Sequence, residues 1–201
     1  MIRVKICGIT RIEDAQSAAA AGADAIGLVF AEGTPRQVDL DQARRIALSL
    51  PPFVSRVGLF MDADADRVER VLEWVPLDLL QFHGRETQRF CRRFGRPWMK
   101  ALAMGGDQPD DPAAFDEADA LLLDAHAPGQ AGGSGHTFDW NRVPDVGNRW
   151  VLAGGLHPGN VADACRVLGP PAVDVSSGVE SSPGVKSDKL IRDFIKAVKN
   201  G

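Results

Sequence analysis

The chain has 201 residues, of which 44% are hydrophobic and 25% are charged, and this composition is typical of a folded globular protein rather than a disordered one. Its formal net charge of -4 argues against a broad nucleic-acid surface, because binding a phosphate backbone needs a concentrated basic face. No apolar run approaches membrane-spanning length and no signal-peptide pattern precedes the first predicted strand, so we expect a cytoplasmic protein without a membrane partner.

Eight short apolar runs recur along the chain and predict strands. They lie near residues 2–7, 25–30, 54–60, 77–82, 98–102, 120–124, 150–153 and 172–176. Apolar residues at helical spacing separate several of these runs, most clearly over 40–50, 68–75, 161–168 and 190–198. The segments after Leu102 and Asp124 are rich in Gly, Pro and Asp, so the fifth and sixth helices are only weakly predicted.

Several residues predict where these helices begin and end. Thr10 with Glu13 forms a capping-box pattern, and Gly22 and Gly169 stand where C-terminal glycines belong. The pair Pro51-Pro52 should stop the helix before it.

Alternating strands and helices indicate a parallel sheet, because parallel strands need long crossovers that cover the sheet. Eight such units predict an α/β fold of the closed (β/α)8 TIM-barrel type, with residues 1–201 forming one small domain. The alternative is a doubly wound open sheet, which would usually carry a GxGxxG fingerprint after its first strand, and "CGITRIED" lacks it.

The functional face of such a barrel is formed by the loops after the strands, and the first strand ends there at Cys7. Strand alternation places Lys5 and Cys7 on the face opposite Val4 and Ile6, so we expect the thiol to point into the barrel. Lys5 should favour the thiolate. The other two cysteines, Cys91 and Cys165, lie on apolar helical faces and are expected to be buried hydrophobes. The three cysteines lack metal-type spacing, so neither a disulfide framework nor a zinc site is expected.

Asp124 closes the apolar sixth strand, where a carboxylate is costly unless it is solvated or paired. Strands one and six are three steps apart in an eight-stranded ring, so Cys7 and Asp124 should face each other across the barrel mouth. Two proton-transfer groups would then act on opposite sides of one substrate.

Two glycine-bearing loops predict a phosphate site after strands seven and eight. "LAGGLHPGNV" contains Gly154 and Gly155, and "DVSSGVE" contains Ser176, Ser177 and Gly178. Exposed backbone N–H groups at these positions commonly bind phosphate in barrels.

The remaining candidates leave alternatives open. Arg36 is either a carboxylate-binding residue or a solvated surface arginine, and His83 either orients a ligand or satisfies a backbone carbonyl. His126 and His136 flank a glycine-rich stretch without a ligand partner at familiar spacing, so no metal site is expected.

Seven motifs in order resemble the phosphoribosylanthranilate isomerase family of tryptophan biosynthesis over the entire chain. They are "KICGIT", "GLVF" with "TPRQV", "LLQFHG", "LLLDA", "GGSGHTFDW", "LAGGLHPGNV" and "DVSSGVESSPGVK". The resemblance implies a cofactor-free (β/α)8 barrel that converts a small phosphosugar, N-(5-phosphoribosyl)anthranilate, into an aminoketose by an Amadori rearrangement. The sequence leaves open whether the protein is a monomer or a homodimer. It also implies that Cys7 is the general base and Asp124 the general acid, that Arg36 meets the anthranilate carboxylate, that the glycine loops hold the phosphate, and that His83 lies in the pocket.

Departures from the family pattern are small: Thr34 where serine is frequent, Ser134 where threonine is frequent, and Ser187 inserted before Asp188. The segment "APGQAGGSG" has the composition of a mobile lid. Two alternatives remain: the related isomerase of histidine biosynthesis, which uses an aspartate where Cys7 stands, and a non-catalytic phosphate-binding barrel.

Overall fold

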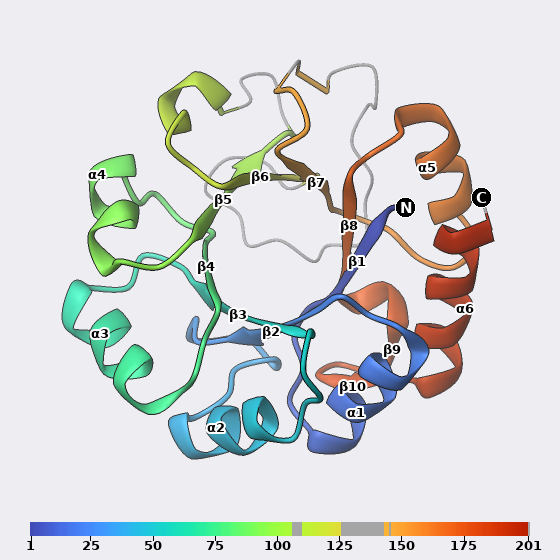
Figure 1. Cartoon of the computed structure of the whole chain (residues 1–201), viewed down its shortest axis with the longest axis horizontal. Coiled ribbons are helices and arrows are strands. Elements are labelled where there is room, and N and C mark those ends of the chain that lie inside the picture. The colour runs from blue at the N-terminus through green and yellow to red at the C-terminus, as the bar shows by residue number, and fades with distance from the viewer. Residues whose placement is uncertain (106–109, 126–142, 145, 201) are drawn as a thin grey trace.

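The computed structural model describes residues 1–105, 110–125, 143–144 and 146–200. His126, His136 and the glycine-rich segment 127–135 therefore lie outside the described residues. Eight parallel strands close into a barrel in chain order, with helices around the outside (Figure 1). This confirms the predicted (β/α)8 fold.

The strands are β1 (Arg3–Ile6), β2 (Ala25–Val29), β3 (Ser55–Phe60), β4 (Leu79–Phe82), β5 (Trp98–Ala103), β6 (Ala120–Asp124), β7 (Trp150–Leu152) and β8 (Ala172–Val175). The helices are α1 (Ile12–Ala21), α2 (Leu40–Leu48), α3 (Ala65–Trp74), α4 (Gln88–Cys91), α5 (Val161–Leu168) and α6 (Asp188–Asn200), with short 3-10 turns at Arg92–Phe94, Pro112–Phe115 and Ser177–Val179. None of these helices has the length and apolar character needed to cross a bilayer.

The start of α1 differs from the capping-box prediction. The helix begins after Arg11, and no side chain caps it. The Thr10 hydroxyl instead donates to the carbonyl of Gly184, 2.5 Å away, so a contact distant in the sequence replaces the local cap. The predicted helix ends are confirmed at Gly22 and Gly169, which both adopt the left-handed conformation.

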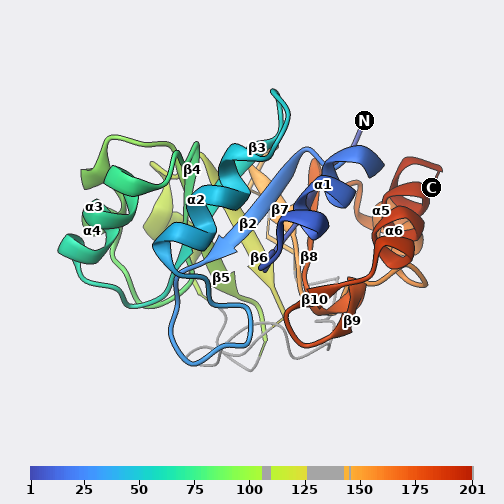
Figure 2. The same cartoon turned by 90° about the horizontal axis from the view of Figure 1, so that it is seen from below.

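A short hairpin, β9 (Glu180–Ser182) with β10 (Val185–Lys186), follows β8 and was not predicted. It lies at the same end of the barrel as the loop after β2, at the lower edge of Figure 2, whereas the N-terminus lies at the opposite end.

The core has an outer and an inner part. Val4 and Ile6 belong to the outer part, between the strands and the helices. Inside the barrel, an apolar plug fills the N-terminal half, formed by Val57, Met99, Ala101, Leu122, Val151 and Ala153. A separate inner cluster of Cys7, Val29 and Leu59 lies toward the other end. The plug separates this inner cluster from the N-terminal opening of the barrel, where Val57, Met99 and Val151 of the plug line another cavity.

Candidate active site

A cavity of about 160 Å³ opens at the C-terminal ends of the strands. Five of the predicted site residues line it: Cys7, Arg36, His83, Asp124 and Ser176. Gly154, Gly155, Ser177 and Gly178 are not in its lining. The structure thus places the predicted proton-transfer groups in one cavity, with Cys7 at the end of β1 and Asp124 at the end of β6.

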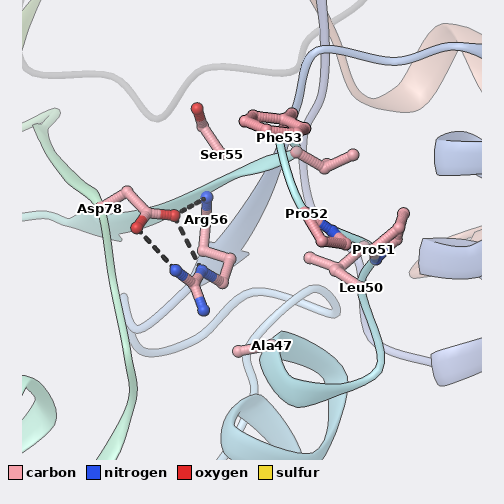
Figure 3. Close-up of a pocket in the computed structure, with 9 residues that line it drawn as sticks. Ala47, Leu50, Pro51, Pro52, Phe53, Ser55, Arg56 and Asp78 are labelled. Carbon is pink, nitrogen blue, oxygen red and sulfur yellow. Dashed lines mark hydrogen bonds and ion pairs between the residues drawn. The ribbon is translucent and has the colours of Figure 1, made fainter.

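A larger cavity of about 540 Å³ lies at the N-terminal ends of β3 and β4, beneath the loop containing Pro51, Pro52 and Phe53 (Figure 3). Its charged groups are Arg56 and Asp78, which satisfy each other in a bidentate pair. The two charges neutralise each other, and the only other polar side chain among the described residues of this lining is the hydroxyl of Ser55, so the lining offers no pair of opposed proton carriers.

Cys7 is buried, and its position depends on neighbouring strands. Its backbone N–H donates to the carbonyl of Val175 at 2.8 Å. Glycine at position 27 of β2 leaves room for the sulfur, because a Cβ there would lie 2.7 Å from it. The inward direction predicted for Cys7 is confirmed.

A buried ion pair, Lys5 with Asp174, lies next to Cys7 inside the barrel. Lys5 Nζ lies 2.8 Å from Asp174 Oδ1, with side chains 7% and 10% exposed. Burial alone would lower the pKa of Lys5, but Asp174 and Cys7 outweigh it and hold this pKa above its ordinary value. Lys5 is therefore an ammonium group whose charge Asp174 largely neutralises.

This pairing limits what Lys5 does for Cys7. Burial raises the pKa of the Cys7 thiol, Lys5 lowers it, and Asp174 raises it again, with the net result above the ordinary value. The expectation that Lys5 favours the thiolate is correct in direction, but burial is the larger effect. Asp174 is a cavity residue that the sequence analysis missed, although its place between Val173 and Val175 gives it the inward face of β8.

Two polar side chains at the end of β4, those of Gln81 and His83, lead to Asp124. The Nε2 atom of His83 is 3.5 Å from Oδ2 of Asp124, and Nδ1 of His83 is 3.1 Å from Nε2 of Gln81. Gln81 is buried within the strand and was not predicted. The His83 ring therefore lies between Gln81 and the acid candidate Asp124.

A second buried cluster fixes the loop that carries His83. Glu86 accepts hydrogen bonds from the backbone N–H groups of Asp62 and Gly84 at 2.8 and 2.9 Å. Lys100 lies 3.5 Å from Glu86, and both side chains are 3% exposed. The loops after β3 and β4 are thus tied together.

Arg36 is not a solvated surface residue. Its Nε and Nη2 atoms each donate to Glu180 at 2.8 Å, and its side chain is only 17% exposed. Glu180 was not predicted as a site residue. The two lie 144 positions apart in the sequence, so no local pattern could have shown the pair.

The two glycine loops meet each other at the rim. A Cβ on Gly178 would lie 1.9 Å from the carbonyl oxygen of Leu156, so the loops after β7 and β8 are in backbone contact. Gly154 and Gly155 both have positive φ, 83° and 64°. Among the described residues, the amide N–H groups of Gly155 and Gly178 meet no acceptor. These donors are available to an anion, and the phosphate site stays a prediction.

Cys91 and Cys165 are buried as expected, and burial raises both pKa values, that of Cys91 to about 12. Within the described ranges, no three or more His, Cys, Asp or Glu side chains are grouped to bind a metal.

The closed parallel barrel and a cavity at its C-terminal end, lined by a thiol and a carboxylate, define the class of (β/α)8-barrel enzymes. The family model described as N-(5'phosphoribosyl)anthranilate (PRA) isomerase matches residues 4–197, and the chain belongs to this family.

Individual relatives agree over their full length. The chain is 54% identical over 201 residues to the N-(5'-phosphoribosyl)anthranilate isomerase of Acidithiobacillus ferrooxidans, covering 99% of this chain and 98% of the relative. It matches the crystal structure of phosphoribosyl anthranilate isomerase from Thermotoga maritima with a TM-score of 0.91 and 42% identity, covering 100% of both chains. A further isomerase structure, in complex with reduced 1-(o-carboxyphenylamino)-1-deoxyribulose 5-phosphate, matches with a TM-score of 0.82 and 38% identity over 100% of both chains.

Proposed function

We propose that this chain is an isomerase of tryptophan biosynthesis that converts N-(5'-phosphoribosyl)anthranilate into 1-(2-carboxyphenylamino)-1-deoxyribulose 5-phosphate, with Cys7 and Asp124 as its proton carriers. Family membership supports the reaction. The observation that carries the residue assignment is that both groups line one cavity from strands three steps apart in the ring. An intramolecular rearrangement of this kind needs a proton donor and a proton acceptor on opposite faces of the sugar.

The proposed steps use that placement. Asp124 donates its proton to the furanose ring oxygen, the bond from C1 to that oxygen breaks, and the nitrogen lone pair forms an iminium. Cys7, as the thiolate, then removes the proton from C2, and the electrons of that bond neutralise the iminium to give an enolamine. The enolamine tautomerises to the ketone, so the hydrogen count of the sugar is unchanged.

The remaining residues bind the ends of the substrate. The unsatisfied amides of Gly155 and Gly178, with Gly154, Ser176 and Ser177 beside them, suit the phosphate. Arg36 suits the anthranilate carboxylate because guanidinium and carboxylate pair in a bidentate geometry. The reduced product found in the relative's complex should bind this chain in the same way.

The proposal is tested by measuring whether the purified protein consumes N-(5'-phosphoribosyl)anthranilate, which is fluorescent. The wild type should consume the substrate, while Cys7→Ala and Asp124→Asn should each lose about 10² to 10⁴ in rate and keep most of their affinity for the reduced product. A barrel that only binds phosphate would bind the reduced product without turning over the substrate. A histidine-pathway isomerase would prefer a different aminoaldose. The cytoplasmic location, the absence of a nucleic-acid partner, and the choice between monomer and homodimer stay predictions.

A further inference from the structure

The Arg36–Glu180 pair uses one particular edge of the guanidinium. Nε donates to Oε1 and Nη2 to Oε2, both at 2.8 Å, so the Nε–Nη2 edge is engaged by the protein itself. A guanidinium has five N–H donors in a planar fork. Among the described residues, no acceptor reaches Nη1. One edge of Arg36 is therefore satisfied within the protein, and the other remains for a ligand in the cavity that Arg36 lines.

Glu180 also contacts a second cation, Lys186. Lys186 Nζ lies 2.8 Å from its Oε1, and it also donates to the carbonyl of Ser176 at 3.0 Å and to the Ser176 hydroxyl at 3.3 Å. The side chains of Lys186 and Glu180 are 0% and 6% exposed. The hydrogen bonds from Arg36 and Lys186 outweigh burial and lower the pKa of Glu180, so it is a carboxylate.

The charges of this buried cluster do not cancel. As long as Cys7 is a neutral thiol, Arg36 and Lys186 carry two positive charges against the single negative charge of Glu180, and the neighbouring Lys5–Asp174 pair is neutral as a whole. Burial lowers the pKa of Lys186, and its contacts with Glu180 oppose this shift. A partly buried cluster with one excess positive charge favours an anionic ligand.

The stem of Arg36 is also fixed by packing. A Cβ on Gly8 would lie 2.6 Å from Cδ of Arg36, so the side chain crosses the backbone directly after Cys7. Gly8 has φ of 73°, which glycine adopts without strain. Glycine at this position leaves room for the Arg36 side chain, and the Glu180 carboxylate holds the guanidinium.

We propose that Glu180 is a positioning residue for substrate specificity: it holds Arg36 so that the second guanidinium edge faces the cavity and receives the aromatic carboxylate of the substrate. This rests on the proposed function, since it needs Arg36 to meet that carboxylate. The hairpin β9–β10 then has a role, because Glu180 and Lys186 are both supplied by it. Without the Glu180 charge, Arg36 and Lys186 repel each other and Arg36 loses its fixed direction.

Binding of two ligands distinguishes a role of Glu180 in recognising the carboxylate from a role in the stability of the fold alone. The first is the reduced product, and the second is the same molecule without the ring carboxylate. We measure the dissociation constants of both for the wild type and for Glu180→Gln, which keeps the side-chain volume but loses the charge. Glu180→Gln should weaken the carboxylate-bearing ligand about tenfold to a hundredfold, the scale of lost charge-assisted hydrogen bonds, and should change the other ligand less than about twofold. In turnover, the same variant should raise KM and largely keep kcat.

A matched control lies at the opposite end of the barrel. Arg56 donates to Asp78 through Nε and Nη2 at 2.8 and 2.7 Å, in the same bidentate arrangement (Figure 3). Asp78→Asn makes the same chemical change far from the cavity and should leave both dissociation constants unchanged. Circular dichroism checks that each variant folds. If Glu180→Gln does not fold, Glu180→Asp replaces it, because it keeps the charge but shortens the side chain, and the dissociation constants of the two ligands are compared in the same way.

The outcomes are separable. Equal weakening of both ligands by Glu180→Gln, or no weakening of either, overturns the role of Glu180 while leaving the isomerase proposal intact. A wild type that neither binds the reduced product nor consumes the substrate contradicts the proposed function itself.

Discussion

Gly27 of β2 lies directly against Cys7, the residue that follows β1: a Cβ added to Gly27 would come within 2.7 Å of the sulfur and 3.1 Å of the Cys7 Cα. The backbone at this point is fixed as well, because the Gly27 carbonyl accepts a hydrogen bond from Ile9 at 2.9 Å. The thiol therefore occupies the space that any larger residue at position 27 would need.

Gly27→Ala should displace the sulfur and lower kcat/KM about 10²-fold, because misplacing a reacting group by about 1 Å costs a rate factor of that size. Steady-state kinetics with the fluorescent substrate measure the loss. Leu48→Ala is the control, since Leu48 is exposed on α2 and does not line the cavity. Full activity in Gly27→Ala would show that the position of Cys7 does not matter.

Lys5 and Asp174 should shift the pKa of Cys7 in opposite directions. Removing the ammonium with Lys5→Met should raise this pKa, and removing the carboxylate with Asp174→Asn should lower it, because one charge favours the thiolate and the other disfavours it. The pH dependence of Cys7 alkylation by iodoacetamide measures both shifts in a background where Cys91 and Cys165 are serine. The double variant Lys5→Met with Asp174→Asn avoids a lone buried charge and controls for the damage of the single changes.

The pH dependence of catalysis follows from the same group. Burial holds the pKa of Cys7 above its ordinary value, and the general base acts only as thiolate. The kcat/KM should therefore rise as the pH increases from neutral toward the pKa of the thiol, and the rising limb should move to lower pH in Asp174→Asn. A rising limb that coincides in both enzymes would exclude Cys7 as its source.

The fold could be predicted from the sequence because buried parallel strands are short apolar runs, and all eight were recognisable. Two elements were missed for different reasons. The Thr10 hydroxyl bonds to the distant Gly184 instead of capping α1. The hairpin β9–β10 is local, but its two strands are too short to give a pattern in the sequence. In the site, Cys7 and Asp124 could be predicted because each ends a strand. Gln81 and Glu180 could not, since their roles come from His83 and Arg36, which only the folded chain brings to them.

The Lys100–Glu86 cluster should be worth far more than a surface ion pair. Lys100→Met leaves the Glu86 charge buried and should lower the free energy of unfolding by about 3 to 5 kcal/mol. Lys189→Met, which removes an exposed helical pair with Asp193, should cost less than about 1 kcal/mol. Urea unfolding compares the two, and equal costs would mean that the Lys100–Glu86 pair is effectively solvated.

Gly178→Ala should separate the two phosphate loops, because its Cβ would lie 1.9 Å from the Leu156 carbonyl oxygen. The dissociation constant of inorganic phosphate should rise about tenfold or more, since the loops could no longer present their amide groups together. Calorimetric titration with phosphate measures this. Unchanged phosphate affinity would place the anion elsewhere.

The most direct test of the two opposed proton carriers is the rate at which the wild type, Cys7→Ala and Asp124→Asn consume the fluorescent substrate at saturating concentration. Active wild type with a loss of about 10² to 10⁴ in kcat for each variant, and unchanged affinity for the reduced product, is the expected result. Either variant turning over at the wild-type rate would contradict the assignment.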